Sequence, residues 1–140
     1  MTTPTQSRKL FVNLPVRELE RSVQFFTRLG FRFDPRFTDA SATCMIVSEE
    51  AFVMLLVAER FKGFTSKQLC DTSKHTEALF ALTATSRTEV DELVHRAIDA
   101  GGTHAQPPQD HGFMYAWSFY DLDGHHWEVL ARCEGGAARA

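Results

Sequence analysis

Residues 114–130 read MYAWSFYDLDGHHWEVL, and the order of residues is typical of two strands joined by a tight turn. The first part, 114–120, is rich in aromatic side chains, which favour the pleated, half-buried surface of a sheet. Asp121, Asp123 and Gly124 supply turn chemistry, because aspartate bonds the local backbone and glycine adopts positive φ without steric cost. The stretch therefore predicts a β-hairpin near the end of the chain.

The returning strand, 126–130, alternates between two chemical characters. Trp127 and Val129 fall on one side and indicate the core face, whereas His126 and Glu128 fall on the other. An acid in the middle of a strand faces either water, a nearby donor or a cavity in which it acts on a ligand. Glu128 is therefore the first candidate functional residue, with a solvated or paired carboxylate as the alternative.

Length, charge and cysteine usage narrow the class of protein. The chain has 140 residues, which predicts one domain with a sizeable core, and its net charge of −3 without a basic run argues against a nucleic-acid partner. No stretch approaches the ~20 apolar residues that span a bilayer, and residues 1–9 form no apolar signal region, so we expect no membrane partner and a cytoplasmic protein. Cys44, Cys70 and Cys133 are odd in number and far apart, which indicates reduced thiols.

The first half of the chain predicts one strand, one helix and three further strands. Apolar residues at helical spacing predict a helix over 17–29. The strands are expected over 8–14, 31–37, 43–48 and 52–57.

The second half repeats this order. A strand is expected over 78–85, Ser86 and Glu89 form a capping box, and an apolar stripe over 90–98 predicts a helix that three strand candidates follow. Residues 61–77 are polar and indicate a connection that crosses the fold or its mouth.

A duplicated βαβββ module predicts an α+β fold. The modules span about 8–58 and about 78–131, and the linker spans 59–77. We expect two curved sheets that enclose a cavity, with the helices outside.

Two segments resemble the vicinal-oxygen-chelate superfamily, which includes glyoxalase I, bleomycin-resistance proteins and extradiol dioxygenases. They are residues 13–22 running into 25–31, and residues 121–129. The resemblance covers about 9–130. It implies the duplicated fold and a homodimer, and it leaves open an isomerase, a lyase, a dioxygenase, a transferase or a plain binding protein.

More closely, the chain resembles the branch labelled predicted lactoylglutathione lyases. Residues 11–16, 71–74 and 110–115 carry this closer resemblance.

The resemblance also implies where a metal would bind. The four ligand positions of metal-dependent members fall on Phe11, on or near Leu55, on Leu79 and on Glu128, of which only Glu128 keeps a ligand type. One carboxylate cannot hold a divalent ion against water, so we predict no metal at the usual site and no cofactor. A shifted divalent-metal site, with His111 and His126 beside Glu128, is the alternative.

Three classes of function follow. The first is a protein that binds or sequesters a small, partly apolar molecule in the cavity, whose acidic wall would favour a cation. The second is a metal-dependent lyase, isomerase or dioxygenase that uses a shifted site. The third is a metal-free enzyme in which Glu128 is the general base and His111 or Tyr115 the acid. A solvated loop position is the alternative for His111, and for Tyr115 core packing is favoured over contact with a ligand.

The ligand-binding candidates are the residues expected around the cavity: Phe11, Asn13, Leu55, Leu79 and His126.

Overall fold

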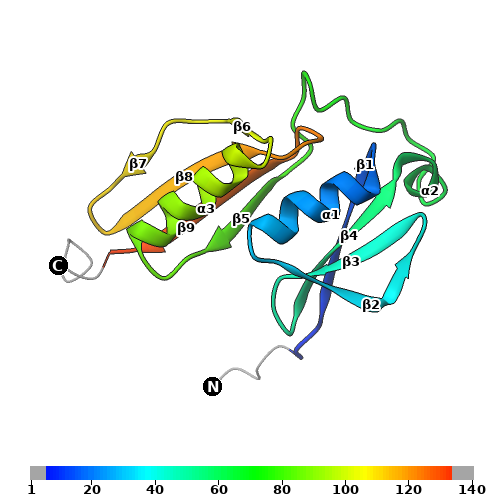
Figure 1. Ribbon diagram of the computed structural model, residues 1–140, viewed down its shortest axis with the longest axis horizontal. Coiled ribbons are helices and arrows are strands. Elements are labelled where there is room, and N and C mark those ends of the chain that lie inside the picture. The colour runs from blue at the N-terminus through cyan, green and yellow to red at the C-terminus, as the bar shows by residue number, and fades with distance from the viewer. Residues whose placement is uncertain (1–5, 134–140) are drawn as a thin grey trace. The chain divides into compact units, whose positions relative to one another are not determined.

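The computed structural model describes residues 6–133 as helices, strands and connections (Figure 1). The chain forms two compact units. One contains the chain up to Val23 together with Gly30–Gln68, and the other contains Gln24–Leu29 together with the chain from Leu69 onward. The unit boundary falls inside the expected linker, and the last turns of the first helix belong to the second unit.

The first unit is built on a four-stranded sheet with the order β1-β4-β3-β2. β1 and β4 run parallel, whereas β4 with β3 and β3 with β2 are antiparallel. The elements in this part of the chain are β1 (Leu10–Val16), α1 (Leu19–Arg28), β2 (Arg32–Asp39), β3 (Ala42–Ile46), β4 (Ala51–Val57) and α2 (Ala58–Lys62), of which the end of α1 belongs to the second unit.

The two faces of the β1–β4 pair differ in burial. Leu14 pairs in register with Leu55, and both side chains are buried, at 2% and 0% exposed. Phe11 pairs with Phe52 on the other face, where Phe11 is 44% exposed. The expectation that Leu55 shares a cavity face with Phe11 is therefore wrong. Met54, the register partner of Asn13, occupies the position in β4 that faces the same side as Phe11.

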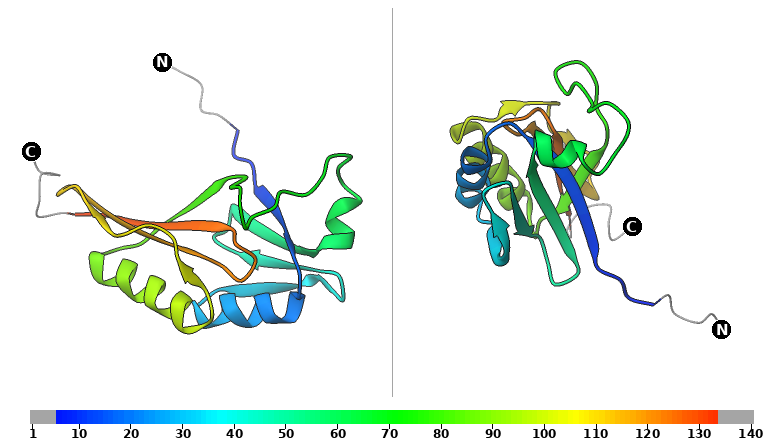
Figure 2. Two further views of the ribbon diagram at one scale, coloured as in Figure 1. Left: turned by 90° about the horizontal axis from the view of Figure 1, so that it is seen from above. Right: turned by 90° about the vertical axis from the view of Figure 1, so that its right-hand side faces the viewer.

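The second unit contains a five-stranded sheet with the order β5-β9-β8-β6, in which β7 also pairs with β8. Its elements are β5 (Leu79–Thr83), α3 (Arg87–Asp99), β6 (Thr103–His104), β7 (Gln109–Asp110), β8 (Met114–Tyr120) and β9 (His126–Arg132). α3 lies along one face of this sheet (Figure 2). The expected hairpin is confirmed as β8 and β9, with Gly124 at a φ of 83° in the turn.

Aromatic packing fills the core of the second unit. The centroid of the Trp127 ring lies 5.3 Å from that of Phe26 and 5.2 Å from that of Phe80, and the centroids of Phe25 and Phe119 lie 6.2 Å apart. α3 buries Val90, Val94 and Ala97 against this layer. The prediction that Trp127 and Val129 face the core is confirmed, since they are 1% and 0% exposed.

The capping box begins α3 as the sequence indicates. The Ser86 hydroxyl accepts the Glu89 amide at 3.1 Å, and the Glu89 carboxylate accepts the Thr85 amide at 2.6 Å. The carboxylate thus reaches one residue further back than the cap itself.

The predicted α+β fold is confirmed, with sheets of four and five strands. Sequence reasoning missed α2, whose five residues fall at the end of the expected first module and the start of the expected linker. It also ended the first strand at Pro15, but β1 continues to Val16 because a proline is tolerated in a strand at the edge of a sheet. Within the described residues, no helix has the length and apolar character needed to cross a membrane.

Candidate functional site

The candidate site lies on the face of the second sheet opposite α3, which we call the open face. Parallel pairing places Leu79 beside His126 and Ala81 beside Glu128, so these four side chains define it. Leu79 is 60% exposed and Glu128 is half-buried. The open face therefore joins an apolar strand to a strand that carries an acid and an imidazole.

His126 is the least accessible of these side chains. It is 7% exposed, and its ring meets the Tyr120 ring in a T-shaped arrangement with the centroids 5.3 Å apart. Its Nε2 lies 3.3 Å from Glu128 Oε2 but makes no hydrogen bond with the described residues, because the two atoms are not aligned for one. A buried imidazole nitrogen without a hydrogen bond is costly, and a ligand that reached it would offset this cost.

Tyr115 does not join this pair. It shares the α3 side of β8 with Trp117 and Phe119, and its hydroxyl donates to the Asp91 carboxylate at 2.6 Å. Burial, and then the hydrogen bond to Asp91, raise the pKa of Tyr115 to about 12. The pairing of Tyr115 as acid with Glu128 as base is therefore wrong, because the two residues lie on opposite faces of one sheet.

His111 lies in the exposed loop between β7 and β8. The loop is held by Asp110, whose carboxylate receives two bonds from the Arg87 guanidinium, at 2.6 and 2.8 Å. This contact lowers the pKa of Asp110 to about 2. The loop joins β8 at Met114, four residues from the Ser118 that pairs with Glu128, which is roughly 13 Å along a strand. The structure thus does not bring His111 to Glu128.

The candidates of the first unit form an aromatic and apolar surface. Phe11 stacks on Phe52 with ring centroids 4.7 Å apart, and the Lys9 ammonium lies 5.6 Å from the Phe52 centroid. The Asn13 amide donates to the Phe11 carbonyl at 3.3 Å. No acid or imidazole joins Phe11, Asn13 or Met54 along this pair of strands.

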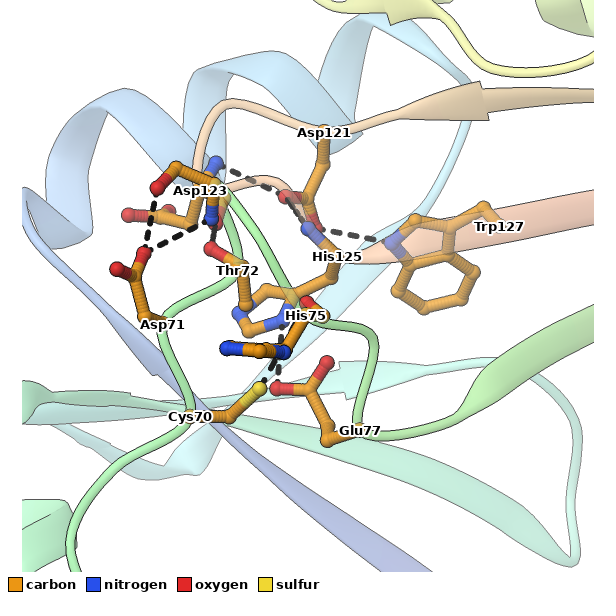
Figure 3. A network of polar contacts seen from close by, with 10 residues as sticks. Cys70, Asp71, Thr72, His75, Glu77, Asp121, Asp123, His125 and Trp127 are labelled. Atoms are coloured by element: carbon orange, nitrogen blue, oxygen red, sulfur yellow. Dashed lines mark hydrogen bonds and ion pairs between the residues drawn. The ribbon is translucent and has the colours of Figure 1, made fainter.

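A second polar cluster surrounds the turn between β8 and β9, and sequence reasoning did not foresee it (Figure 3). Asp121 is buried, and its carboxylate accepts the amides of Asp123 at 2.9 Å and His125 at 3.0 Å and the Trp127 indole at 2.9 Å. Burial raises the pKa of Asp121, while His125 and these hydrogen bonds act in the opposite direction. The sequence identified the turn, but it carried no signal that the aspartate lies in the core.

The end of the linker packs on the outside of the same turn. The Thr72 hydroxyl donates to the Asp123 carbonyl, and Glu77 Oε2 lies 3.4 Å from the Nδ1 of His125, which is 1% exposed (Figure 3). The nearby Cys70 thiol donates to the His75 carbonyl at 3.7 Å. Burial and two acids, Glu77 and Asp71, raise the pKa of Cys70, which keeps it a protonated and weakly nucleophilic thiol.

The open face does not fit a divalent metal. Only two of its side chains, His126 and Glu128, are ligand types, and the flanking positions are Leu79 and Ala81. Across the described residues, no three His, Cys, Asp or Glu side chains gather so that they could hold an ion. Manganese, zinc and related ions require more ligands than this pair offers.

Comparison with known proteins places this geometry in a family. The family model of the glyoxalase/bleomycin resistance protein/dioxygenase superfamily matches residues 10–129. The chain belongs to this superfamily. No curated protein matches the chain.

Solved structures share the fold. A hypothetical protein, SA1046, from S. aureus is 29% identical, with a TM-score of 0.76 over 91% of this chain and 95% of that chain. A family enzyme from Burkholderia phytofirmans PsJN is 16% identical, with a TM-score of 0.74 over 88% and 97%. A mutant of the fosfomycin resistance protein FosX from Listeria monocytogenes, complexed with Mn(II) and dihydroxypropylphosphonic acid, is 17% identical, with a TM-score of 0.64 over 94% and 93%.

Proposed function

We propose that this superfamily member binds a small, partly apolar molecule on the open face without a resident metal. The observation that supports it most directly is the His126–Glu128 pair, whose atoms lie 3.3 Å apart beside an exposed Leu79. A ligand there gains apolar contact with Leu79 and Ala81 and a polar contact with the carboxylate. FosX was crystallised with Mn(II) and a small phosphonate, which supports small-molecule binding by this fold.

The ligand class follows from the carboxylate of Glu128. A carboxylate on an otherwise apolar face attracts a cation or a hydrogen-bond donor and repels an anion. We therefore propose an aryl or alkyl amine rather than a carboxylate or phosphonate. We also propose that the protein is a cytoplasmic homodimer, as the family resemblance implies.

The first experiment measures metal content by mass spectrometry after the untagged protein is offered Ni²⁺, Zn²⁺, Mn²⁺ and Fe²⁺ anaerobically and desalted. We expect no stoichiometric metal. A stoichiometric metal that disappears in Glu128→Ala would overturn the proposal and make a metal-dependent lyase, isomerase or dioxygenase the leading function.

The second experiment screens ligands by NMR. Primary and quaternary amines with matched aryl groups are compared with the corresponding carboxylates. We expect amines to shift the signals of β5 and β9, and Glu128→Gln to weaken binding roughly tenfold or more, since charged hydrogen bonds are stronger than neutral ones. Glu92→Gln, at an exposed position on α3, is the matched control. Binding of carboxylates in preference to amines would contradict the proposed ligand class.

A further inference from the structure

We infer that Thr72 and Glu77 are positioning residues, which hold the start of β9 and thereby orient His126 and Glu128. They belong to the segment Leu69–Glu77, which we call the strap. The strap packs within the second unit on the turn that precedes β9. The inference rests on the proposed function only where ligand affinity is read, because the position of His126 can be measured without a ligand.

The strap approaches the turn closely at Gly124. A Cβ at this position would lie 2.7 Å from Thr72 Oγ1, 3.0 Å from Thr72 Cβ and 3.2 Å from the Thr72 carbonyl oxygen. Only glycine leaves room for the strap here, and the φ of 83° also favours glycine. The Thr72 hydroxyl uses this approach to donate to the Asp123 carbonyl.

A second contact lies one residue before the candidate site. Glu77 Oε2 lies 3.4 Å from His125 Nδ1, and His125 is almost wholly buried. His125 precedes His126 directly, so a displacement of its ring is transmitted to the first residue of β9.

Asp121 holds the same turn from the core side. It binds the His125 amide and the Trp127 indole, the two neighbours of His126 in the chain. Because side chains alternate along a strand, fixing Trp127 in the core directs His126 and Glu128 to the open face. The strap and Asp121 therefore clamp the turn from two sides (Figure 3).

The strap is also ordered by its own bonds. The Asp71 carboxylate accepts the Ser73 amide at 3.0 Å and its hydroxyl at 2.6 Å. The Asp71 carbonyl accepts the amides of Lys74 and His75, at 3.0 and 2.8 Å. A turn that is already formed loses little conformational entropy when it docks, which suits a positioning element.

Limited trypsin digestion tests the docking. Lys67 precedes the strap and Lys74 lies within its turn, so we expect slow cleavage after Lys74 relative to Lys67. Thr72→Val should speed cleavage after Lys74 roughly fivefold, because one hydrogen bond is lost, and Thr72→Ser should restore protection. Thr65→Val is the matched control for cleavage after Lys74, since the Thr65 hydroxyl accepts the Lys67 amide at 3.1 Å, seven residues before Lys74.

The positioning role is read from the His126 ring nitrogen shifts in NMR spectra at fixed pH, assigned with a His126→Asn variant. Thr72→Val and Glu77→Gln should move these shifts, whereas Thr72→Ser and Thr65→Val should not. An amine that binds should lose affinity in the same two variants.

Two outcomes would overturn the inference: equal cleavage after Lys74 and Lys67 in the unchanged protein, or release of the strap with unmoved His126 signals. If the His126 signals move while no amine binds the unchanged protein, the positioning role stands and the proposed ligand fails.

Discussion

The parallel pairs β1–β4 and β5–β9 hold corresponding places in the two units but differ in the chemistry of their exposed faces. In each unit the first strand pairs in parallel with the last strand of the module. The face opposite the buried residues carries two cross-strand pairs. They are Phe11 with Phe52 and Asn13 with Met54 in the first unit, and Leu79 with His126 and Ala81 with Glu128 in the second.

The difference shows that the scaffold fixes positions and leaves chemistry to the side chains. The rings of Phe11 and Phe52 stack with centroids 4.7 Å apart, and neither side chain carries a polar group that requires a hydrogen bond. The second unit instead places Nε2 of a buried His126 near Glu128 without a hydrogen bond. Buried polar groups that lack hydrogen bonds are rare in folded proteins, which is why we propose that the ligand binds to the second unit.

The largest expected effect concerns the core positions beneath these faces. Trp127 and Val53 follow His126 and Phe52 in their strands and are 1% and 4% exposed. Trp127→Ala should lower the free energy of unfolding by about 3–5 kcal/mol. Val53→Ala should lower it by about 1.5–2.5 kcal/mol, since it removes two methyl groups. Urea unfolding followed by circular dichroism measures both losses. Equal losses would show that the core beneath β9 contributes no more to the free energy of unfolding than the core beneath β4.

Replacing a glycine at positive φ by alanine should lower the free energy of unfolding by less. Gly124 and Gly30 form a matched pair for this test. Gly124→Ala introduces backbone strain and a contact 2.7 Å from Thr72 Oγ1, whereas Gly30→Ala, at a φ of 106°, meets nothing within 4 Å. We expect losses of about 2–3 kcal/mol for Gly124→Ala and about 1–2 kcal/mol for Gly30→Ala. A larger loss at Gly30 in the same unfolding experiment would argue against close docking of the strap.

Exchanging the side chains of Glu128 and Met54, which hold corresponding positions in the two units, should change the free energy of unfolding less. Glu128→Met gives the second unit the side chain that the first unit carries at Met54, and we expect a change within about 1 kcal/mol because the His126–Glu128 pair is partly exposed. Met54→Glu should lower the free energy of unfolding by about 1–2 kcal/mol, since it places a carboxylate in an apolar, half-buried position. A loss above about 3 kcal/mol for Glu128→Met would make Glu128 a structural residue.

The sequence predicted the fold well because periodic patterns encode it. Alternation in residues 126–130 identified the core face of β9, and the capping box at Ser86 located the start of α3. Leu55 was misplaced because an apolar run such as Ala51–Val57 carries no alternation that separates its two faces. Its orientation is fixed by register with Leu14, which no local pattern reveals.

The site was less predictable because it depends on contacts between distant segments. Tyr115 and Glu128 were grouped by chemical type, whereas the pairing of β8 with β9 assigns them to opposite faces. Thr72 and Glu77 lie 51 and 48 residues before their partners, Asp123 and His125, and looked like ordinary linker residues. Sequence spacing alone gives no reason to bring such residues together.

The smallest expected effect is a shift in the titration midpoint of Tyr115, which lies on the face of the second sheet opposite the open face. Tyr115, on the α3 face, has its pKa raised to about 12 by burial and by Asp91. Its contribution to stability is therefore complete below about pH 10 and is lost as the pH rises toward 12. In a Tyr120→Phe background, which leaves one of two tyrosines, absorbance at alkaline pH follows Tyr115 alone. Asp91→Asn should lower the midpoint, because the hydrogen bond to a carboxylate and its like charge are removed. An unchanged midpoint would mean that burial alone sets the pKa and that Asp91 does not tie β8 to α3.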